Sequence, residues 1–170
     1  LSLYFHLPFC DTICYYCACN KIVTKNRARA APYLAALHRE LALQGALFDR
    51  GRVVEQLHWG GGTPTFLSHD EMRQLMDSIR EHFHLQPNGE YSIEVDPRKV
   101  DEATVALLGE LGFNRMSLGV QDFDLAVQEA VNRVQTVEET ESVLRAARAN
   151  GFKSISVDRI YGLPKQNVIS

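Results

Sequence analysis

The stretch HLPFCDTICYYCAC, residues 6–19, carries four cysteines within ten positions, and it is the most informative part of the sequence for the fold. Three residues separate Cys10 from Cys14 and two separate Cys14 from Cys17. Three thiolates can therefore converge on one small inorganic centre from a single loop. Thiolates select soft metals, chiefly zinc and iron–sulfur clusters. A [4Fe–4S] cube held by three cysteines keeps one iron free to bind a small molecule, so the spacing indicates chemistry.

A structural zinc site is the alternative interpretation of these cysteines. Structural zinc usually has four protein ligands in a closed tetrahedron, and Cys19 or His6 could complete such a set. A disulfide framework fits less well, because its cysteines are usually spread through a small secreted domain. Cysteine crowding therefore favours a reducing cytoplasm as the location.

The composition excludes several other classes of protein. The chain has 170 residues, of which 45% are hydrophobic, enough for one sizeable core. A formal charge of −3 gives no basic field for nucleic acid, and no polybasic run suggests a membrane surface. No apolar run approaches the length of a transmembrane helix, and the first residues lack a signal-peptide pattern. Both ends look cut, so we expect a piece of a longer protein.

Short β-type runs alternate with helix-type runs along the whole chain. Pro32, the pairs Ser68/Glu71 and Thr136/Glu139, and Asp101 mark the first turns or caps of four helices. Pro87-Asn88-Gly89 punctuates the chain before the third strand, and Gly112 is a good helix terminator. The predicted strands span residues 3–7, 54–59, 91–95, 115–120 and 154–158.

Such alternation predicts an α/β fold with βαβ units on a parallel sheet. Right-handed crossovers place the carboxyl end of every strand on one rim, where ligands bind in parallel α/β folds. The polar and glycine-rich features all follow strand ends. They are the cysteine loop, Gly60-Gly61-Gly62, Glu94, Gln121 and Asp158. We therefore expect one binding site built from five strand ends.

Several strings resemble the radical S-adenosylmethionine (SAM) enzymes, and among them the oxygen-independent coproporphyrinogen III oxidase (dehydrogenase) family. They are HLPFCDTICYYCACNKIVT, GGGTPT, MSLGVQDFD, VNRVQ and IYGLPKQ. The resemblance spans the chain, although family members are well over twice as long. It implies a partial parallel (β/α)6 radical SAM barrel, truncated here to about five βα units. Residues 1–170 would be the catalytic core, without the N-terminal extension, the end of the barrel and the C-terminal domain.

The resemblance also implies an activity and its cofactors. A [4Fe–4S] cluster binds SAM, and electron transfer from an unidentified donor yields a 5′-deoxyadenosyl radical. That radical initiates oxidative decarboxylation of two propionates of coproporphyrinogen III, giving protoporphyrinogen IX in anaerobic haem biosynthesis. The family is expected to hold two SAM molecules.

Family motifs assign roles to individual residues. Cys10, Cys14 and Cys17 resemble the cluster ligands, and Cys19 resembles an extra cysteine that does not ligate the cluster. The positions that resemble SAM-contacting residues are Tyr4, Tyr16, Gly61, Gly62, Thr63, Glu94, Gln121, Arg133 and Asp158. Taken alone, Arg133 reads as a surface salt-bridge residue, Tyr4 as packing, and Asp96 as an ordinary polar residue at a strand end.

Two departures and one alternative function accompany this assignment. Ala18 stands where the family usually has glycine, and Arg159 stands where an aliphatic residue is usual. A buried unpaired Arg159 would be costly, so it must reach solvent or a partner. The alternative is a haem chaperone of the same family without decarboxylase activity. Cys19 and Asn132 favour the enzyme, because the chaperones usually differ at these positions.

Overall fold

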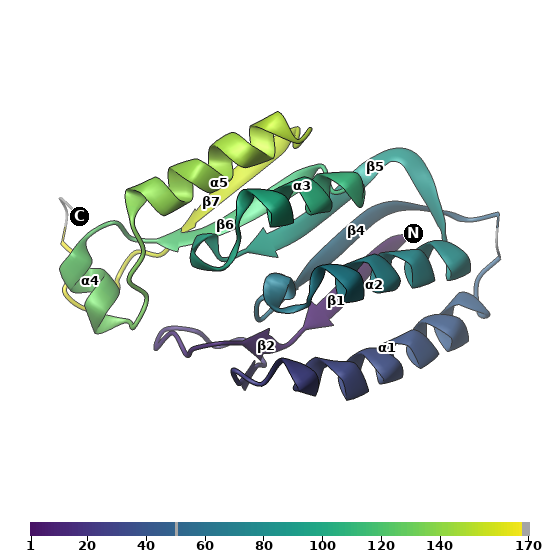
Figure 1. Ribbon diagram of the computed structural model, residues 1–170, viewed down its shortest axis with the longest axis horizontal. Helices are drawn as coiled ribbons and strands as arrows, with labels where there is room; N and C mark the ends of the chain where they lie inside the picture. Colours follow the sequence, from purple (N-terminus) through teal and green to yellow (C-terminus); the bar gives the residue numbers. More distant parts are fainter. Residues whose placement is uncertain (50, 168–170) are drawn as a thin grey trace.

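The structure is a computed structural model that describes residues 1–49 and 51–167. Five parallel strands form its central sheet (Figure 1). The sheet order is β1-β4-β5-β6-β7, and each strand runs parallel to its neighbours. All carboxyl ends therefore share one rim, as the sequence predicts. The strands are β1 (Ser2–Leu7), β4 (Val53–Gly61), β5 (His84–Val95), β6 (Arg115–Gln121) and β7 (Ser154–Arg159).

Four helices cover one face of this sheet (Figure 1). They are α1 (Ala30–Gly45), α2 (His69–His82), α3 (Glu102–Glu110) and α5 (Val137–Ala149). The short helix α4 (Leu125–Ala130) lies instead beyond the carboxyl ends of the strands. The described residues also form three 3₁₀ turns: η1 (Arg27–Arg29), η2 (Pro64–Phe66) and η3 (Pro97–Lys99). The fold is the α/β architecture expected of a partial radical SAM barrel.

The predicted helix caps are confirmed. Ser68 and Thr136 each accept a hydrogen bond from the backbone N–H three residues on, and the glutamate there accepts one from the backbone N–H of the cap residue. Asp101 accepts from the Thr104 N–H at the start of α3. Gly112 has a φ of +98° just after α3, a conformation that glycine adopts without strain. Local sequence thus determines where these helices begin and end.

The two faces of the sheet differ completely in character. Strand register aligns neighbouring side chains in rows across the sheet, and alternate rows point to opposite faces. One row is apolar and packs in the helix-covered core: Phe5, Trp59, Ile93, Met116 and Ile155. The row beside it is polar: Tyr4, His58, Ser92, Arg115 and Ser154. The face away from the helices therefore offers polar groups to whatever occupies it.

Strand β5 begins earlier than predicted. Pro87-Asn88-Gly89 does not precede the strand but lies inside it, where the register with β4 jumps from Val54↔Leu85 to Gln56↔Glu90. The extra residues form an irregular bulge, and Asn88 adopts a φ of 63°. These residues do produce a local irregularity in the backbone. Pairing with β4 on both sides nevertheless keeps them within one strand.

A two-stranded ladder that the sequence did not predict closes the cysteine loop. Strands β2 (Phe9–Cys10) and β3 (Ile22–Val23) pair in parallel. The Ile22 N–H donates to the Pro8 carbonyl at 2.7 Å, and the Thr24 N–H donates to the Cys10 carbonyl at 2.8 Å. Both ends of the loop are thereby fixed beside the end of β1.

Arg159 satisfies the condition set by its charge. About half of its side chain is exposed, and its Nη2 lies 4.0 Å from Oδ2 of the buried Asp122. The guanidinium therefore has both solvent and a partner. Elsewhere, none of the helices in residues 1–49 and 51–167 is long and apolar enough to cross a membrane.

Candidate active site

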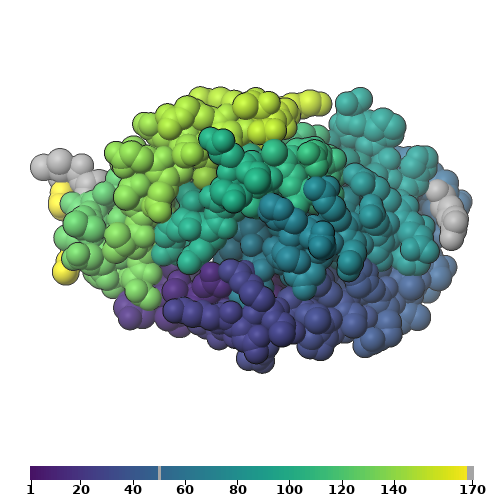
Figure 2. Space-filling view, in the orientation of Figure 1, coloured from purple at the N-terminus to yellow at the C-terminus, as the bar shows by residue number. Residues whose placement is uncertain are grey.

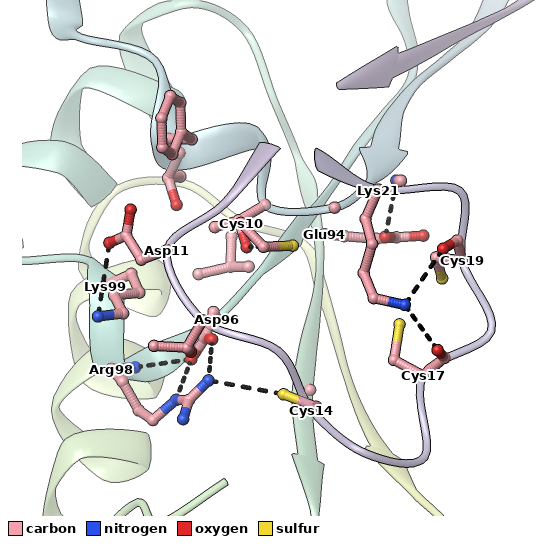
Figure 3. A pocket seen from close by; sticks show the side chains of 18 of the residues that line it. Cys10, Asp11, Cys14, Cys17, Cys19, Lys21, Glu94, Asp96, Arg98 and Lys99 are labelled. Atoms are coloured by element: carbon pink, nitrogen blue, oxygen red, sulfur yellow. Dashed lines mark hydrogen bonds and ion pairs between the residues drawn. The ribbon is translucent and has the colours of Figure 1, made fainter. Parts of the chain in front are cut away.

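The cysteine loop is held in shape by its own backbone and by Lys21. The Cys17 N–H donates to the Cys14 carbonyl at 3.1 Å, which makes a turn between two of the predicted ligands. Lys21 Nζ donates to the Cys17 carbonyl at 2.7 Å and to the Cys19 carbonyl at 3.4 Å (Figure 3). These contacts orient the second half of the loop, so that Cys10, Cys14 and Cys17 surround the same pocket.

One pocket gathers almost every residue that the sequence assigns to the site. It is lined by the three cysteines together with Tyr16, Gly61, Gly62, Thr63, Glu94, Gln121, Arg133 and Asp158. These residues come from the cysteine loop and from the carboxyl ends of four strands, except Arg133, which lies between α4 and α5. Tyr4 is the exception, since it is not among the lining residues. The prediction that the strand ends meet at one site is confirmed.

The glycine segment after β4 lies directly against the chain that leads to Cys10. A Cβ on Gly62 would stand 2.7 Å from the Phe9 carbonyl oxygen and the Pro8 carbonyl carbon, a distance that real Cβ atoms do not show. Gly61 has a φ of +111°. The Thr63 N–H donates to the Phe9 carbonyl at 2.8 Å, and its hydroxyl donates to Cys10 Sγ at 3.7 Å. Only glycine fits where these two segments touch.

Glu94 is fixed from two sides. Its Oε2 accepts from the Gly61 N–H at 3.2 Å, and its Oε1 lies 3.3 Å from His58 Nε2. His58 is itself held through Nδ1, 2.6 Å from the Ser92 hydroxyl. A Cβ on Gly60 would come within 2.8 Å of Glu94 Oε1, so glycine leaves the carboxylate its place. The Glu94 side chain remains 43% exposed and can accept hydrogen bonds from a ligand.

A bulge at the end of β6 aims Gln121 at the pocket. The register with β7 shifts between Gly119 and Gln121, and Gln121 adopts a φ of 71°. Bulges of this kind often redirect side chains beside active sites. Gln121 Oε1 is buried and, in the described part of the chain, accepts no hydrogen bond. On β7, Asp158 accepts from the Ser117 hydroxyl at 2.6 Å.

Arg133 belongs to a buried charged group beside Cys14. Its Nη2 donates to the Gly119 carbonyl at 2.5 Å, and its Nη1 lies 3.6 Å from Cys14 Sγ and 3.4 Å from Asp96 Oδ2. Asp96 also pairs with Arg98 at 2.6 Å (Figure 3). Burial opposes ionisation of Asp96, but its hydrogen bonds to Arg98 and the nearby Arg133 lower its pKa. Reading Arg133 alone as a surface residue and Asp96 as an ordinary strand-end residue was wrong.

The segment after α4 contacts the cysteine loop directly. The Tyr15 N–H donates to the Val131 carbonyl at 3.0 Å, and Asn132 Nδ2 donates to the Ile13 carbonyl at 2.7 Å. Asn132 has a φ of 56°, which asparagine tolerates better than most residues. Figure 2 shows the N-terminal purple surface against the green surface of this region. The loop is therefore supported by a part of the chain far away in sequence.

The two predicted tyrosines have different surroundings. Tyr16 packs against the small apolar cluster of Val127, Val131 and Leu163, and burial raises the pKa of its hydroxyl. Tyr4 is 58% exposed, stacks on His58 at a ring-centroid distance of 5.6 Å, and contacts His6 Nδ1 through its hydroxyl at 3.0 Å. Tyr4 therefore lies next to the Glu94–His58 pair on the polar face.

The surroundings of the cysteines do not favour the zinc alternative. His6 has both ring nitrogens engaged, Nδ1 with Tyr4 and Nε2 with the Asn20 carbonyl at 2.8 Å. Among residues 1–49 and 51–167, no three His, Cys, Asp or Glu side chains form a group that could hold a single metal ion. A cube presents a separate iron to each thiolate, so its ligands stand farther apart than those of one ion. Burial raises the pKa of the Cys10 thiol, although the Thr63 hydroxyl opposes this.

The residues around the pocket fit an iron–sulfur cluster with an organic ligand. Three thiols face the space, and two guanidinium groups stand beside one of them. The unpartnered Gln121 Oε1 is an acceptor that a ligand can satisfy. Gly61 and Gly62 line the pocket without side chains, and their Cβ positions are blocked by His6 and by the backbone of Pro8 and Phe9. Soft thiol ligands and polar groups around one pocket match a cluster together with SAM.

The radical SAM superfamily is the family whose model matches the chain, over residues 4–169, and the chain belongs to this superfamily. The superfamily implies a [4Fe–4S] cluster and SAM as cofactors. The site geometry and the family match therefore identify the same class of protein.

More specific similarity is to the oxygen-independent coproporphyrinogen III oxidases. The chain is 60% identical to that of Pseudomonas aeruginosa over 168 residues, and 51% identical to that of Escherichia coli over 166 residues. Each match covers 98% of this chain and 36% of the relative. The solved structure of coproporphyrinogen III oxidase (HemN) from Escherichia coli superimposes with a TM-score of 0.93 at 50% identity, covering 97% of this chain and 38% of that one.

A radical SAM methyltransferase, TsrM from Kitasatospora setae, has a TM-score of 0.59 at 16% identity and shows the shared fold alone. The predicted resemblance is thus confirmed. The chain spans about a third of the length of the curated relatives it matches.

Sequence reasoning missed the pocket residues Asp96 and Arg98. Asp96 follows Glu94 by two residues, so that spacing alone indicates that both side chains extend from one face of the strand. That signal was available. Nothing local, however, indicates that Arg133 completes the group from the other side of the pocket.

Proposed function

We propose that the protein containing this chain catalyses oxidative decarboxylation of two propionates of coproporphyrinogen III to vinyl groups, giving protoporphyrinogen IX. The observation that carries this proposal is the 60% identity to a coproporphyrinogen III oxidase over 98% of the chain. The pocket supports it, since cysteine ligands and polar strand ends face one space. Residues 1–170 would form the core of a radical SAM catalytic domain in a longer cytoplasmic protein.

Cys10, Cys14 and Cys17 would hold the cluster. Cluster and SAM together supply a one-electron reductive cleavage, which is the source of the radical. The Gly61-Gly62-Thr63 segment, which lines the same pocket as the cysteines, would receive the aminoacyl end of SAM. Arg133, anchored on the Gly119 carbonyl, would bring a guanidinium charge toward the SAM carboxylate.

Other residues that line the pocket would bind the nucleoside. Glu94 is held by His58 and Gly61 with its carboxylate partly exposed, as a hydrogen-bond acceptor for ribose hydroxyls must be. Gln121 and Asp158 would contact the same ligand from β6 and β7, and Tyr16 would pack against its adenine. Tyr4, outside the pocket lining, would also contact SAM, of which the protein would hold two molecules. The electron donor would be a separate protein or small reductant.

The test is anaerobic reconstitution of the full-length protein with iron and sulfide, followed by SAM, a reductant and coproporphyrinogen III. We expect a brown protein that forms 5′-deoxyadenosine together with protoporphyrinogen IX. A matched control is Cys10→Ala, which should lose both products, whereas Cys19→Ala should keep its cluster. A wild-type protein that carries only zinc, or that cleaves SAM without decarboxylation under all conditions, would contradict the proposal.

The haem chaperone alternative predicts tight stoichiometric haem binding and no decarboxylation. Cys19 and Asn132 favour the enzyme, because the chaperones usually differ at these two positions. Haem titration of the same reconstituted preparation distinguishes the two functions. Saturation at one haem per chain without product formation would favour the chaperone.

A further inference from the structure

Asp96, Arg98 and Arg133 form a compact charged group beside Cys14. Of these three residues, only Arg133 has a role in the proposed binding of SAM. Asp96 lies between two guanidinium groups, 2.6 Å from Arg98 Nη2 and 3.4 Å from Arg133 Nη1. Arg98 makes a second contact to Asp96, from Nε to Oδ1 at 2.9 Å. Both arginines also approach Cys14 Sγ, Arg133 at 3.6 Å and Arg98 at 4.0 Å. Asp96 thus fixes two cations on one predicted cluster ligand.

Burial makes these charges effective. The exposed fractions of the three side chains are 10% for Asp96, 14% for Arg98 and 9% for Arg133. Charges removed from water are screened far less by salt than surface charges. One carboxylate and two guanidinium groups leave a net charge of +1 beside the sulfur. Such a charge stabilises the reduced cluster, which carries one more electron than the oxidised cluster.

The guanidinium of Arg98 also has N–H groups that can donate a hydrogen bond to the sulfur of Cys14. Hydrogen bonds to cluster sulfurs, net charge and solvent exposure are the means by which proteins set the reduction potential of an iron–sulfur cluster. Arg98 does not reach the glycine segment or Glu94 in any contact among the described residues. Its position is explained by Asp96 and Cys14.

We propose that Asp96 and Arg98 are positioning residues that set the reduction potential of the cluster through Cys14. Arg98 raises the potential by its charge and by donating toward the sulfur. Asp96 holds Arg98 and Arg133 in place while offsetting part of their charge. This inference rests on the proposed cluster at Cys10, Cys14 and Cys17.

The experiment is a redox titration of the reduced cluster by electron paramagnetic resonance, on the anaerobically reconstituted full-length protein without SAM. Arg98→Gln should shift the midpoint potential to a more negative value, because a nearby cation is lost. Asp96→Asn should shift it to a more positive value, because a nearby anion is lost while the amide oxygen still accepts from Arg98 and the Gly119 carbonyl still holds Arg133. Arg98→Lys should lie between wild type and Arg98→Gln, since it keeps the charge and loses the fork.

Arg73→Gln is the matched control, because Arg73 pairs with Glu110 on the surface at 3.3 Å and should leave the potential unchanged. Iron and sulfide content per chain checks that each variant carries its cluster. If Asp96→Asn loses the cluster, the order of the two Arg98 variants decides the matter. Shifts of the same sign for Arg98→Gln and Asp96→Asn, or no shift in Arg98→Gln, would overturn the inference.

Two further results have distinct meanings. Arg98→Gln with an unchanged potential and weakened SAM binding would make Arg98 a cofactor-binding residue and overturn the inference. A wild-type protein that never takes up a cluster would refute the proposed function itself. The two failures are therefore distinguishable in the same set of preparations.

Discussion

Gly62→Ala tests whether the glycine segment and the cysteine loop depend on each other for position. The new Cβ would stand 2.7 Å from two backbone atoms of Pro8 and Phe9, whereas ordinary contact begins at 3.4 Å. The difference, 3.4 − 2.7 = 0.7 Å, must come from movement of backbone, since no flexible side chain can yield. Overpacking of this kind costs about 1–3 kcal/mol. Loss of the Thr63 N–H bond to Phe9 adds about 1 kcal/mol.

We therefore expect the free energy of unfolding to fall by about 2–4 kcal/mol. Because Cys10 follows Phe9, the reconstituted variant should also contain less iron per chain. Thermal unfolding followed by circular dichroism, together with iron and sulfide analysis, measures both effects. Gly51→Ala is the control, because its Cβ would meet Asp49 Oδ1 at an ordinary 3.4 Å. Wild-type stability and iron content in Gly62→Ala would refute this account of the contact.

Three smaller changes test other parts of the chain. Thr136→Ala removes the cap of α5 and should destabilise the domain by about 1 kcal/mol in chemical denaturation. Asn132→Ala should lose iron to a chelator faster than Asn132→Gly, because both lose the bond to Ile13 but only alanine opposes the φ of 56°. Bonds from Thr104 lower the pKa of Asp101 below 3.8, so its stabilising contribution is present above that pH and lost as the pH falls through the lowered value. Asp101→Asn should flatten this acid limb when unfolding is followed against pH.

Much of the fold could be predicted because its signals are local. The apolar stripe of α2 and the capping residues Ser68, Asp101 and Thr136 act within a few residues of each other. The alternation of strands and helices then fixes a parallel sheet by right-handed crossovers. Placing Glu94, Gln121 and Asp158 at one rim follows from this topology alone.

The features that were not predicted depend on long-range contacts. The sequence Pro87-Asn88-Gly89 indicates a strand boundary. In the structure, however, β4 pairs with the chain on both sides of this segment. From the sequence, Asp96 resembles a solvated carboxylate at a strand end. In the structure it pairs with Arg133, which follows β6 in the chain. The positive φ of Gln121 results from a bulge against β7. Sequence periodicity contains none of this information, because each case is decided by a neighbour distant along the chain.

Each strand contributes one side chain to the polar row that begins at Tyr4 and one to the apolar row that begins at Phe5. The apolar row stabilises the fold, and the polar row faces the site. Saturation mutagenesis along β4 to β6 should give a sawtooth profile with a period of two. At Trp59, Ile93 and Met116 substitutions would lower the yield of folded protein, and at His58 and Ser92 they would lower turnover at normal yield. New specificities could therefore evolve on the second set without loss of folding.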